Sequence, residues 1–267
     1  MEKVAKLLII AGSDSGGGAG IQADLKAASA LGVYGATAIT AVTAQNTVGV
    51  QSVATLAQEM VAAQIRSVLD DIDIDAVKIG MLGAVEIIEA VAQALQGFAG
   101  PVVLDPVMVA KSGDALLDAS AVTALRDHLL PRATMLTPNL PEAARLLEHD
   151  PATTSERMEA QGAALRALGP DAVLMKGGHA EGETCRDLLV TEAGFTAFEA
   201  PRLTTRNTHG TGCSLSSAIA AEMAKGAAPE AAVRRAHGWL HGAIAAADRL
   251  EVGRGHGPVH HFHEVWA

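Results

Sequence analysis

The chain has 267 residues, of which 49% are hydrophobic and 19% are charged, so it is long enough to bury a sizeable core. Its formal net charge of −10, with Lys and Arg scattered along the sequence, disfavours nucleic acid and anionic membrane surfaces as partners. No apolar run is long enough to span a bilayer, and two cysteines are too few for a disulfide framework, so we expect a cytoplasmic protein that acts on a small molecule.

Short apolar runs alternate with longer amphipathic segments along most of the chain. The runs that predict buried strands are residues 6–10, 33–44, 76–79, 102–104, 135–137 and 173–175. The segments that predict helices are residues 21–31, 57–69, 84–95, 120–130, 142–147 and 155–168. The last part of the chain then predicts a hairpin from 187–191 and 195–199, helices ending at 224 and spanning 229–250, and an irregular tail over 253–267.

Strand and helix alternate regularly enough to predict the fold class. Apolar strands joined by crossover helices form a mainly parallel sheet that is covered on both faces, which gives a three-layer α/β/α architecture. The hairpin adds a small antiparallel edge. Because no linker, charge block or repeat divides the chain, we expect a single domain over residues 1–267.

Polar residues follow the predicted strands at the ends where a ligand is expected. In an open α/β sheet, ligands bind beyond the carboxyl ends of the strands. The residues expected to meet there are Asp14, Gln45, Met81, Asp105, Asn139 and Lys176.

The segment NTHGTGCS, residues 207–214, runs into a helix-forming stretch. The backbone N–H groups of Gly210, Thr211 and Gly212 should therefore lie at a helix N-terminus, which is a favourable place for a phosphate. Cys213 follows them, and the helix dipole should hold its pKa below that of a free cysteine. Cys213 is accordingly a candidate base, the alternative being a small packed thiol.

Other residues allow two interpretations each. Lys176 ends an apolar strand and needs an anion, which could be a phosphate or a core carboxylate. Asn139 and Glu142 could form a helix capping box, or they could join Asp105 in organising Mg²⁺ through oxygens and water. Gln45 offers a donor and an acceptor side by side, which suits the edge of an aminopyrimidine but also a helix cap or the backbone.

Two apparent motifs are set aside. Residues 18–23 match the letters of the dinucleotide fingerprint, but they lie too far beyond the strand, and no acidic residue follows at the required distance. This weakens a nicotinamide oxidoreductase as a possible function. His256, His260, His261 and His263 lack accompanying Cys or carboxylate ligands, so we interpret them as solvated or packed residues.

Several segments together resemble one enzyme family. They are residues 12–14, 17–24, 43–47, 105–108, 110–113, 137–142, 175–179 and 209–213. In this order they resemble the bacterial hydroxymethylpyrimidine/phosphomethylpyrimidine kinases of thiamine biosynthesis, which belong to the ribokinase-like superfamily. The resemblance covers nearly the whole chain and implies a ribokinase-like fold.

The resemblance implies a cytoplasmic homodimer that uses ATP and Mg²⁺. It implies phosphorylation of 4-amino-5-hydroxymethyl-2-methylpyrimidine, and then of the resulting monophosphate. The residues implied around the pyrimidine are Gly12, Asp24, Gln45, Met81, Val107 and Cys213. Those implied for the phosphates are Lys176 and the amides of Gly210, Thr211 and Gly212. To these we add, from the positions of the residues, Asn139 for ATP, Cys213 as the base, and Asp105 and Glu142 as metal residues acting through water. Residues 110–113 are expected to close over ATP as a flap.

Two other functions remain open from the sequence. A pyridoxal kinase of the same superfamily would phosphorylate a hydroxymethyl group on a different ring. A non-catalytic pyrimidine-binding regulator could also use this fold.

Overall fold

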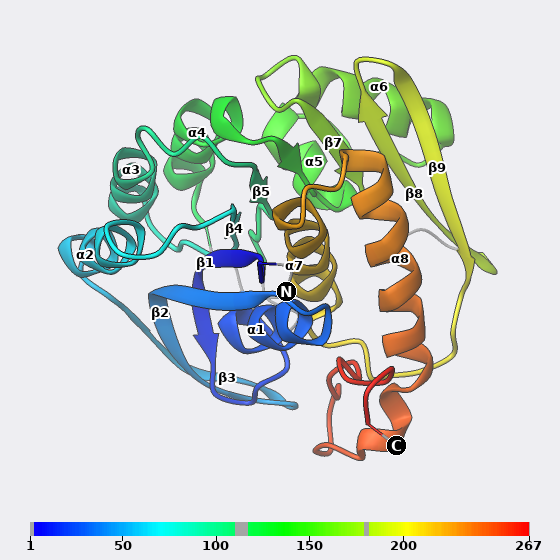
Figure 1. The fold of residues 1–267 in the computed structure, drawn as a ribbon. Helices are drawn as coiled ribbons and strands as arrows, with labels where there is room; N and C mark the ends of the chain where they lie inside the picture. Colours follow the sequence, from blue (N-terminus) through cyan, green and yellow to red (C-terminus); the bar gives the residue numbers. More distant parts are fainter. Residues whose placement is uncertain (1–2, 110–116, 179–181, 267) are drawn as a thin grey trace.

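The structure is a computed structural model that describes residues 3–109, 117–178 and 182–266 (Figure 1). Residues 110–113, the expected flap, and His179 lie outside the described residues. The strands are β1 Lys6–Asp14, β2 Tyr34–Asn46, β3 Gly49–Thr55, β4 Ala76–Ile79, β5 Val102–Leu104, β6 Met135–Leu136, β7 Ala172–Met175, β8 Thr184–Thr191 and β9 Gly194–Pro201. The α-helices are α1 Gly20–Ala30, α2 Gln58–Leu69, α3 Val85–Ala94, α4 Ala119–His128, α5 Leu140–Leu147, α6 Ser155–Arg166, α7 Thr211–Ala224 and α8 Pro229–Ala245, and the two 3-10 turns are η1 Leu130–Arg132 and η2 Ala247–Leu250.

All nine described strands form one sheet in the order β3-β2-β1-β4-β5-β6-β7-β8-β9. The six strands β2, β1, β4, β5, β6 and β7, adjacent in this order, are parallel, and β8 and β9 form the expected antiparallel hairpin. A second antiparallel strand, β3, pairs with β2 at the opposite edge and was not predicted. Its side chains are mostly exposed, so it lacks the alternation of buried and exposed residues by which a strand is found in a sequence.

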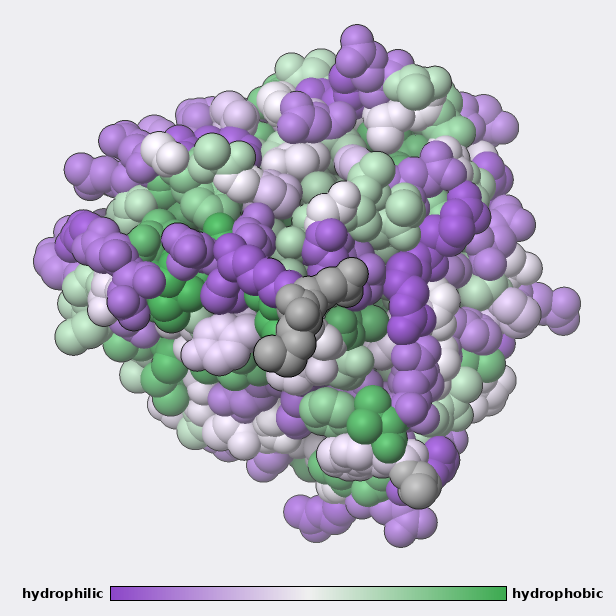
Figure 2. Space-filling view, in the orientation of Figure 1, coloured by the Kyte–Doolittle hydropathy of each residue, from purple (hydrophilic) through white to green (hydrophobic). Residues whose placement is uncertain are grey.

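Two hydrophobic cores lie on opposite faces of the sheet. One is formed with α2 to α6 and the other with α1, α7 and α8 (Figure 1). Alternate residues of β1 enter the two cores, Leu8 and Ile10 the first and Leu7 and Ile9 the second. Hydrophilic side chains project around the rim of the molecule in the view of Figure 2, with smaller apolar areas between them. The predicted three-layer α/β/α architecture with a mainly parallel sheet is therefore confirmed.

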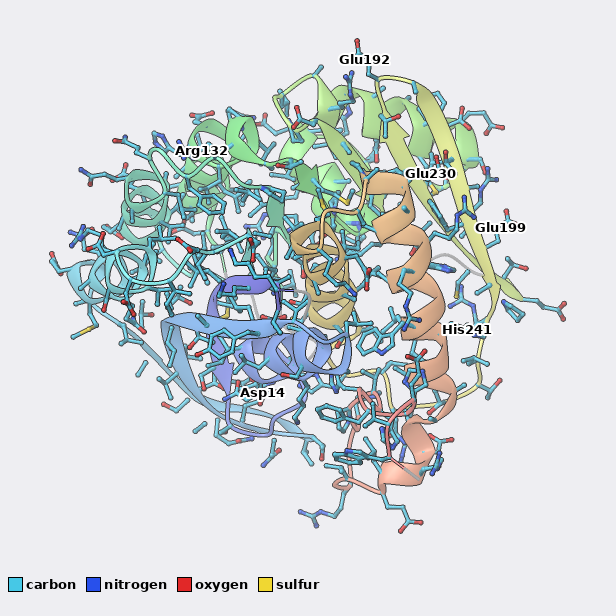
Figure 3. The ribbon with its side chains drawn as sticks, viewed as in Figure 1. Asp14, Arg132, Glu192, Glu199, Glu230 and His241 are labelled. Atoms are coloured by element: carbon cyan, nitrogen blue, oxygen red, sulfur yellow. The ribbon has the colours of Figure 1, made fainter. Side chains whose placement is uncertain are left out.

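The chain order of the strands reverses next to β1. β1 is flanked by β2 on one side and by β4 on the other. The chain thus adds β2 and β3 on one side of β1 and then crosses back to add β4 and the later strands on the other side. Such a switch point opens a crevice at the carboxyl ends of the strands. Asp14 ends β1 at this edge (Figure 3), and the N-terminus of α7 follows the same edge, next to Gly18.

Candidate active site

The turn before α7 is built around Gly210. This residue is the N-cap of α7 and has φ 78°, in the left-handed region that favours glycine. A Cβ atom here would overlap the carbonyl oxygen of Gly18, so the glycine also allows the loop over residues 16–20 to lie against the start of the helix. The first N–H groups of α7 have no partner within the helix, and that of Thr211 makes only a long contact of 3.4 Å with the Thr208 carbonyl oxygen just before it.

Lys176 borders this turn and is paired with Asp105. The Lys176 Nζ atom donates to Asp105 Oδ1 at 2.8 Å. The sequence left open whether Lys176 pairs with a phosphate or with a core carboxylate, and Asp105 is such a carboxylate. A Cβ atom at Gly212 would lie 3.4 Å from Lys176 Nζ and 3.8 Å from Asp105 Oδ2, which places the ion pair directly beside the turn. Burial lowers the pKa of Lys176, but Asp105 and Glu142 outweigh it and hold the pKa above its usual value. Lys176 is therefore a fixed positive charge next to Gly212.

Asp105 is held by hydrogen bonds on both carboxylate oxygens. Oδ1 also accepts from the Thr137 hydroxyl at 3.2 Å, and Oδ2 accepts from the Ser216 hydroxyl of α7 at 3.2 Å. Burial raises the pKa of Asp105, but Lys176 and Lys78 outweigh that effect, so its pKa lies below the usual range. The carboxylate is thus ionised and fixes the position of Lys176.

Asn139 and Glu142 form the capping box at the start of α5. Each side chain accepts a hydrogen bond from the other residue's backbone N–H at 2.8 Å. Burial, strengthened by the negative charge of Asp105, raises the pKa of Glu142 to about 7, although Lys176 opposes the shift. Both earlier interpretations are therefore compatible with the geometry, because the capping box places Glu142 near the Lys176–Asp105 pair.

The two carboxylates offer the hard oxygen donors that Mg²⁺ takes. Asp105 and Glu142 already accept hydrogen bonds from the protein, which suits contact with the ion through water better than direct ligation. No group of three His, Cys, Asp or Glu side chains in the described ranges could hold a metal by itself. The residues present thus fit a metal that shares its coordination with another ligand, such as a phosphate.

The expectation of a depressed pKa at Cys213 is wrong. Burial raises the pKa of this thiol to about 11, and the carboxylates of Asp24 and Asp105 add to the shift. Lys78 and the N–H of Gly20, which donates to the sulfur, only partly offset these effects. Cys213 is the third residue of α7 and is partly exposed as a whole, but the burial of its thiol and the nearby carboxylates together raise the pKa.

Asp24 and Lys78 form a buried ion pair beneath α7 that sequence reasoning missed. Lys78 Nζ donates to both Asp24 oxygens at 2.9 Å, and the Ser217 hydroxyl donates to Oδ1 at 2.7 Å. Both charged side chains are 0% exposed, so Asp24 is not accessible to a ligand from solvent in this structure. Burial raises the pKa of Asp24 and, taken alone, would lower that of Lys78, whose net shift is upward because of the surrounding anions. With the ammonium bonded to both oxygens, we take the pair as ionised.

The remaining residues expected around a pyrimidine lie along the ends of β1, β2, β4 and β5. A Cβ atom at Gly12 would overlap the Met81 side chain, so these two residues are in contact. Gln45, in β2, lies 3.3 Å from the His209 ring, which is bonded to Asp14. Val107 is partly buried just after β5. The structure thus places Gln45 with Asp14, Met81 with Gly12, and Lys176 with Asp105 and Gly212, along a single edge of the sheet.

Two of the tail histidines are packed against the rest of the protein. His260 and His261 are 3% and 4% exposed, and His261 Nε2 lies 2.8 Å from the Ser214 hydroxyl of α7. His256 is exposed. The tail therefore supports the start of α7, which the sequence did not predict.

Comparison with known proteins assigns this site to a family. A family model described as phosphomethylpyrimidine kinase matches residues 14–260. The chain belongs to this family. The hydroxymethylpyrimidine/phosphomethylpyrimidine kinase of Salmonella typhimurium is 56% identical over 260 residues, which cover 97% of this chain and 98% of that protein. This member of the phosphomethylpyrimidine kinase family is accordingly a kinase.

Solved structures of kinases share its ribokinase-like fold. The pyridoxal kinase from Staphylococcus aureus in complex with AMP-PCP and pyridoxal has a TM-score of 0.91 at 31% identity, covering 99% of this chain and 96% of that one. The phosphomethylpyrimidine kinase from Clostridium difficile has a TM-score of 0.80 at 42% identity, covering 91% and 100%. The bound ATP analogue in the first of these supports the use of ATP by this kinase. No helix within the described residues is both long and apolar enough to cross a membrane.

Proposed function

We propose that this chain transfers the γ-phosphoryl group of ATP to 4-amino-5-hydroxymethyl-2-methylpyrimidine and then phosphorylates the monophosphate, in thiamine biosynthesis. The observation that carries the proposal is the turn at Gly210–Gly212, which stands beside Lys176 at the edge of the sheet where Gln45 and Met81 also lie. The high identity to a named hydroxymethylpyrimidine/phosphomethylpyrimidine kinase supports the choice of substrate.

The phosphate side of the reaction is assigned to residues around α7. The N–H groups of Gly210, Thr211 and Gly212 and the positive end of the α7 dipole stabilise negative charge on the transferring phosphoryl group. Lys176 neutralises charge on the ATP phosphates, and Asp105 keeps its ammonium in place. Because the side-chain oxygen of Asn139 caps α5, its amide N–H groups remain as donors for ATP.

The attacking hydroxyl is placed next to Cys213. Phosphoryl transfer through a loose transition state requires positioning more than activation of the nucleophile. We keep Cys213 as the group that receives the proton, but its pKa of about 11 means that only a small thiolate fraction is available at neutral pH. In the second step the nucleophile is a phosphate oxygen that is already anionic, so this role is needed only in the first.

Asp105 and Glu142 are the residues that would hold Mg²⁺, through water. The ion, when bound with ATP, would neutralise charge on the phosphates. A half-protonated Glu142 at neutral pH, with a pKa of about 7, would become fully ionised as the cation binds.

The direct test is an assay with purified protein, ATP, Mg²⁺ and 4-amino-5-hydroxymethyl-2-methylpyrimidine, with the product mass recorded over time. We expect a monophosphate first and a diphosphate later, together with stoichiometric ADP. A calorimetric binding signal without ADP formation would instead support a binding regulator.

Pyridoxal kinase is the second candidate, because two solved pyridoxal kinases share this fold with TM-scores of 0.90 and 0.91. The same assay with pyridoxal at limiting concentration separates the two. We expect the pyrimidine to have the higher kcat/KM, and a higher value for pyridoxal would reverse the assignment.

We further propose a cytoplasmic homodimer of single-domain kinases over residues 1–267. β3 is an edge strand that pairs only with β2 among the described strands, and it lacks the charged side chains that usually protect such an edge. No Asp, Glu, Lys, Arg or His occurs between Lys26 and Glu59, and Val42 and Val53 are each 48% exposed. We therefore place the second copy of the chain against β2 and β3.

A further inference from the structure

The amide group of Gln45 lies between two polar groups that together decide how it is turned. Its nitrogen is placed 3.3 Å from His209 Nε2, and its oxygen 3.2 Å from the Thr43 hydroxyl. The two ends of an amide have the same shape, so the hydrogen-bonding partners determine which end faces which group.

The partner on the first side is fixed by Asp14. His209 Nε2 is 2.9 Å from Asp14 Oδ2. The Asp14 carboxylate also accepts the N–H groups of Gly16, Gly18 and Ala19, so it acts only as an acceptor. Nε2 of His209 must therefore carry the hydrogen. The single hydrogen on Nε2 is then shared between Asp14 Oδ2, at 2.9 Å, and the more distant Gln45 amide, at 3.3 Å. This requires the amide oxygen on the His209 side, because an amide nitrogen there would set two donors against each other.

The second side leads independently to the same orientation. The Thr43 hydroxyl has one hydrogen and lies 3.0 Å from the carbonyl oxygen of Ser13, which can only accept. Once Thr43 donates to Ser13, its oxygen can only accept from Gln45. The amide nitrogen of Gln45 therefore faces Thr43. With this orientation no contact in the chain Asp14, His209, Gln45, Thr43 and Ser13 sets two donors or two acceptors against each other, and only the Nε2 hydrogen of His209 is shared by two acceptors.

We infer that Gln45 offers an amide N–H, and not its oxygen, to a ligand in the cleft, and that His209 is the positioning residue that holds it in this orientation. One N–H of the amide is used by Thr43, and the second remains available because Gln45 is partly exposed. The ligand group that it recognises is an acceptor, for which a ring nitrogen of the aminopyrimidine is suited. This inference rests on the proposed function for the identity of the ligand.

Packing keeps the imidazole in place. A Cβ atom at Gly18 would overlap His209 Cδ2, so the ring lies directly against this glycine. The side chain of His209 is only 13% exposed, which restricts its rotation. His209 thus joins the loop over residues 16–18, which carries two of the N–H donors to Asp14, to the substrate side of the cleft.

The first test replaces Gln45 by Glu and measures binding of 4-amino-5-hydroxymethyl-2-methylpyrimidine by calorimetry without ATP. A carboxylate still accepts from His209, but it has no N–H for the ligand. We expect Kd to rise about tenfold or more, which corresponds to the loss of a hydrogen bond with a donor replaced by an acceptor. Unchanged or tighter binding by Gln45→Glu would overturn the inference, because the ligand would then be using an acceptor.

The second test compares His209→Gln with His209→Leu. Gln retains an N–H donor at similar reach, whereas Leu fills the space without one. We expect Leu to raise Kd for the pyrimidine by about three- to tenfold with the KM for ATP unchanged, and Gln to restore most of the affinity. Equal losses in both variants, or a parallel rise in the KM for ATP, would show that His209 only supports the phosphate turn and would overturn its positioning role.

Failure of this inference is distinguishable from failure of the proposed function. If the wild type phosphorylates the pyrimidine and Gln45→Glu binds it as well as the wild type does, only the inference fails. If the wild type binds the pyrimidine but produces no phosphorylated product, the proposed function fails and the calorimetric comparison still decides the role of Gln45.

Discussion

Cys213 shows how distant residues determine the chemistry of a single side chain. The local sequence predicts a lowered pKa, because the thiol follows a glycine turn at a helix N-terminus. Burial is the main cause of the raised pKa, and the carboxylates that add to it come from α1 and from the end of β5, at positions 24 and 105. Their approach to the sulfur depends on the tertiary fold, and no spacing near Cys213 reports it.

The raised pKa makes a kinetic prediction for Cys213. The thiolate fraction increases as the pH rises toward about 11. If the thiolate receives the proton, the first phosphorylation should accelerate by about tenfold per pH unit from neutrality to about pH 10, whereas the second should change little. Cys213→Ala should abolish this slope and slow the first step more than the second, as measured by product mass in single-turnover reactions. A flat profile with equal losses in both steps would reduce Cys213 to a wall of the pocket.

Lys78 makes a prediction about stability. Lys78→Met would leave the fully buried Asp24 carboxylate without its cation, and we expect the free energy of unfolding to fall by about 3–5 kcal/mol. The double variant Asp24→Leu/Lys78→Met removes both charges and should recover much of the loss in urea unfolding. A single variant that is as stable as the wild type would show that Asp24 is neutral in the folded protein.

At the scale of single elements, α7 combines structural and chemical roles. Its N-terminal turn faces the cleft, its side chains Ser216 and Ser217 bind Asp105 and Asp24, and its apolar residues fill the second core. A change at the start of this helix should therefore affect activity more than a similar change at its end.

Two glycines at opposite ends of α7 test this expectation. Gly210 and Gly226 have φ values of 78° and 88°, so alanine should cost each about 1–2 kcal/mol of backbone strain. A methyl group at Gly210 would also overlap the Gly18 carbonyl, whereas nothing lies within 4 Å at Gly226. We expect Gly210→Ala to lower kcat by at least about a hundredfold and Gly226→Ala to leave it within about twofold of the wild type. Steady-state kinetics check both, and similar kcat values in the two variants would contradict the role of the turn.

The sequence predicted elements better than it predicted contacts. The apolar runs located the parallel strands, and the change of pattern after Lys176 located the β8–β9 hairpin. β3 was missed because its exposed side chains carry no burial pattern. Lys78 was missed although a signal exists, since a single Lys in the buried strand AVKI requires an anion nearby. The role of His209 depends on hydrogen bonds to residues 164 and 195 positions away, which only the fold brings together.

At the scale of the whole molecule, the two edges of the sheet differ. β9 carries Glu199, whereas β3 has no charged residue. An edge without charge is open to pairing with another chain, which is the basis for placing the dimer interface at β2 and β3.

Matched substitutions on the two edges test the interface. Val53 in β3 and Phe195 in β9 are 48% and 51% exposed. We expect Val53→Lys to shift the protein from dimer to monomer in analytical ultracentrifugation, because it would bury a charge at the interface, and Phe195→Lys to leave the dimer intact. A dimer that survives Val53→Lys but not Phe195→Lys would move the interface to β9.

The contacts of the tail with α7 bear on how the kinase matures. His209 forms a backbone bridge with Pro258, and Ser214 is bonded to His261, so the phosphate turn is braced by residues more than forty positions further along the chain. A ribosome that has translated only as far as α8 therefore carries a nascent chain whose sheet can already be complete while its catalytic turn is not. Activity should emerge only after residues 258–261 leave the exit tunnel, so phosphoryl transfer should be acquired later in synthesis than the sheet itself.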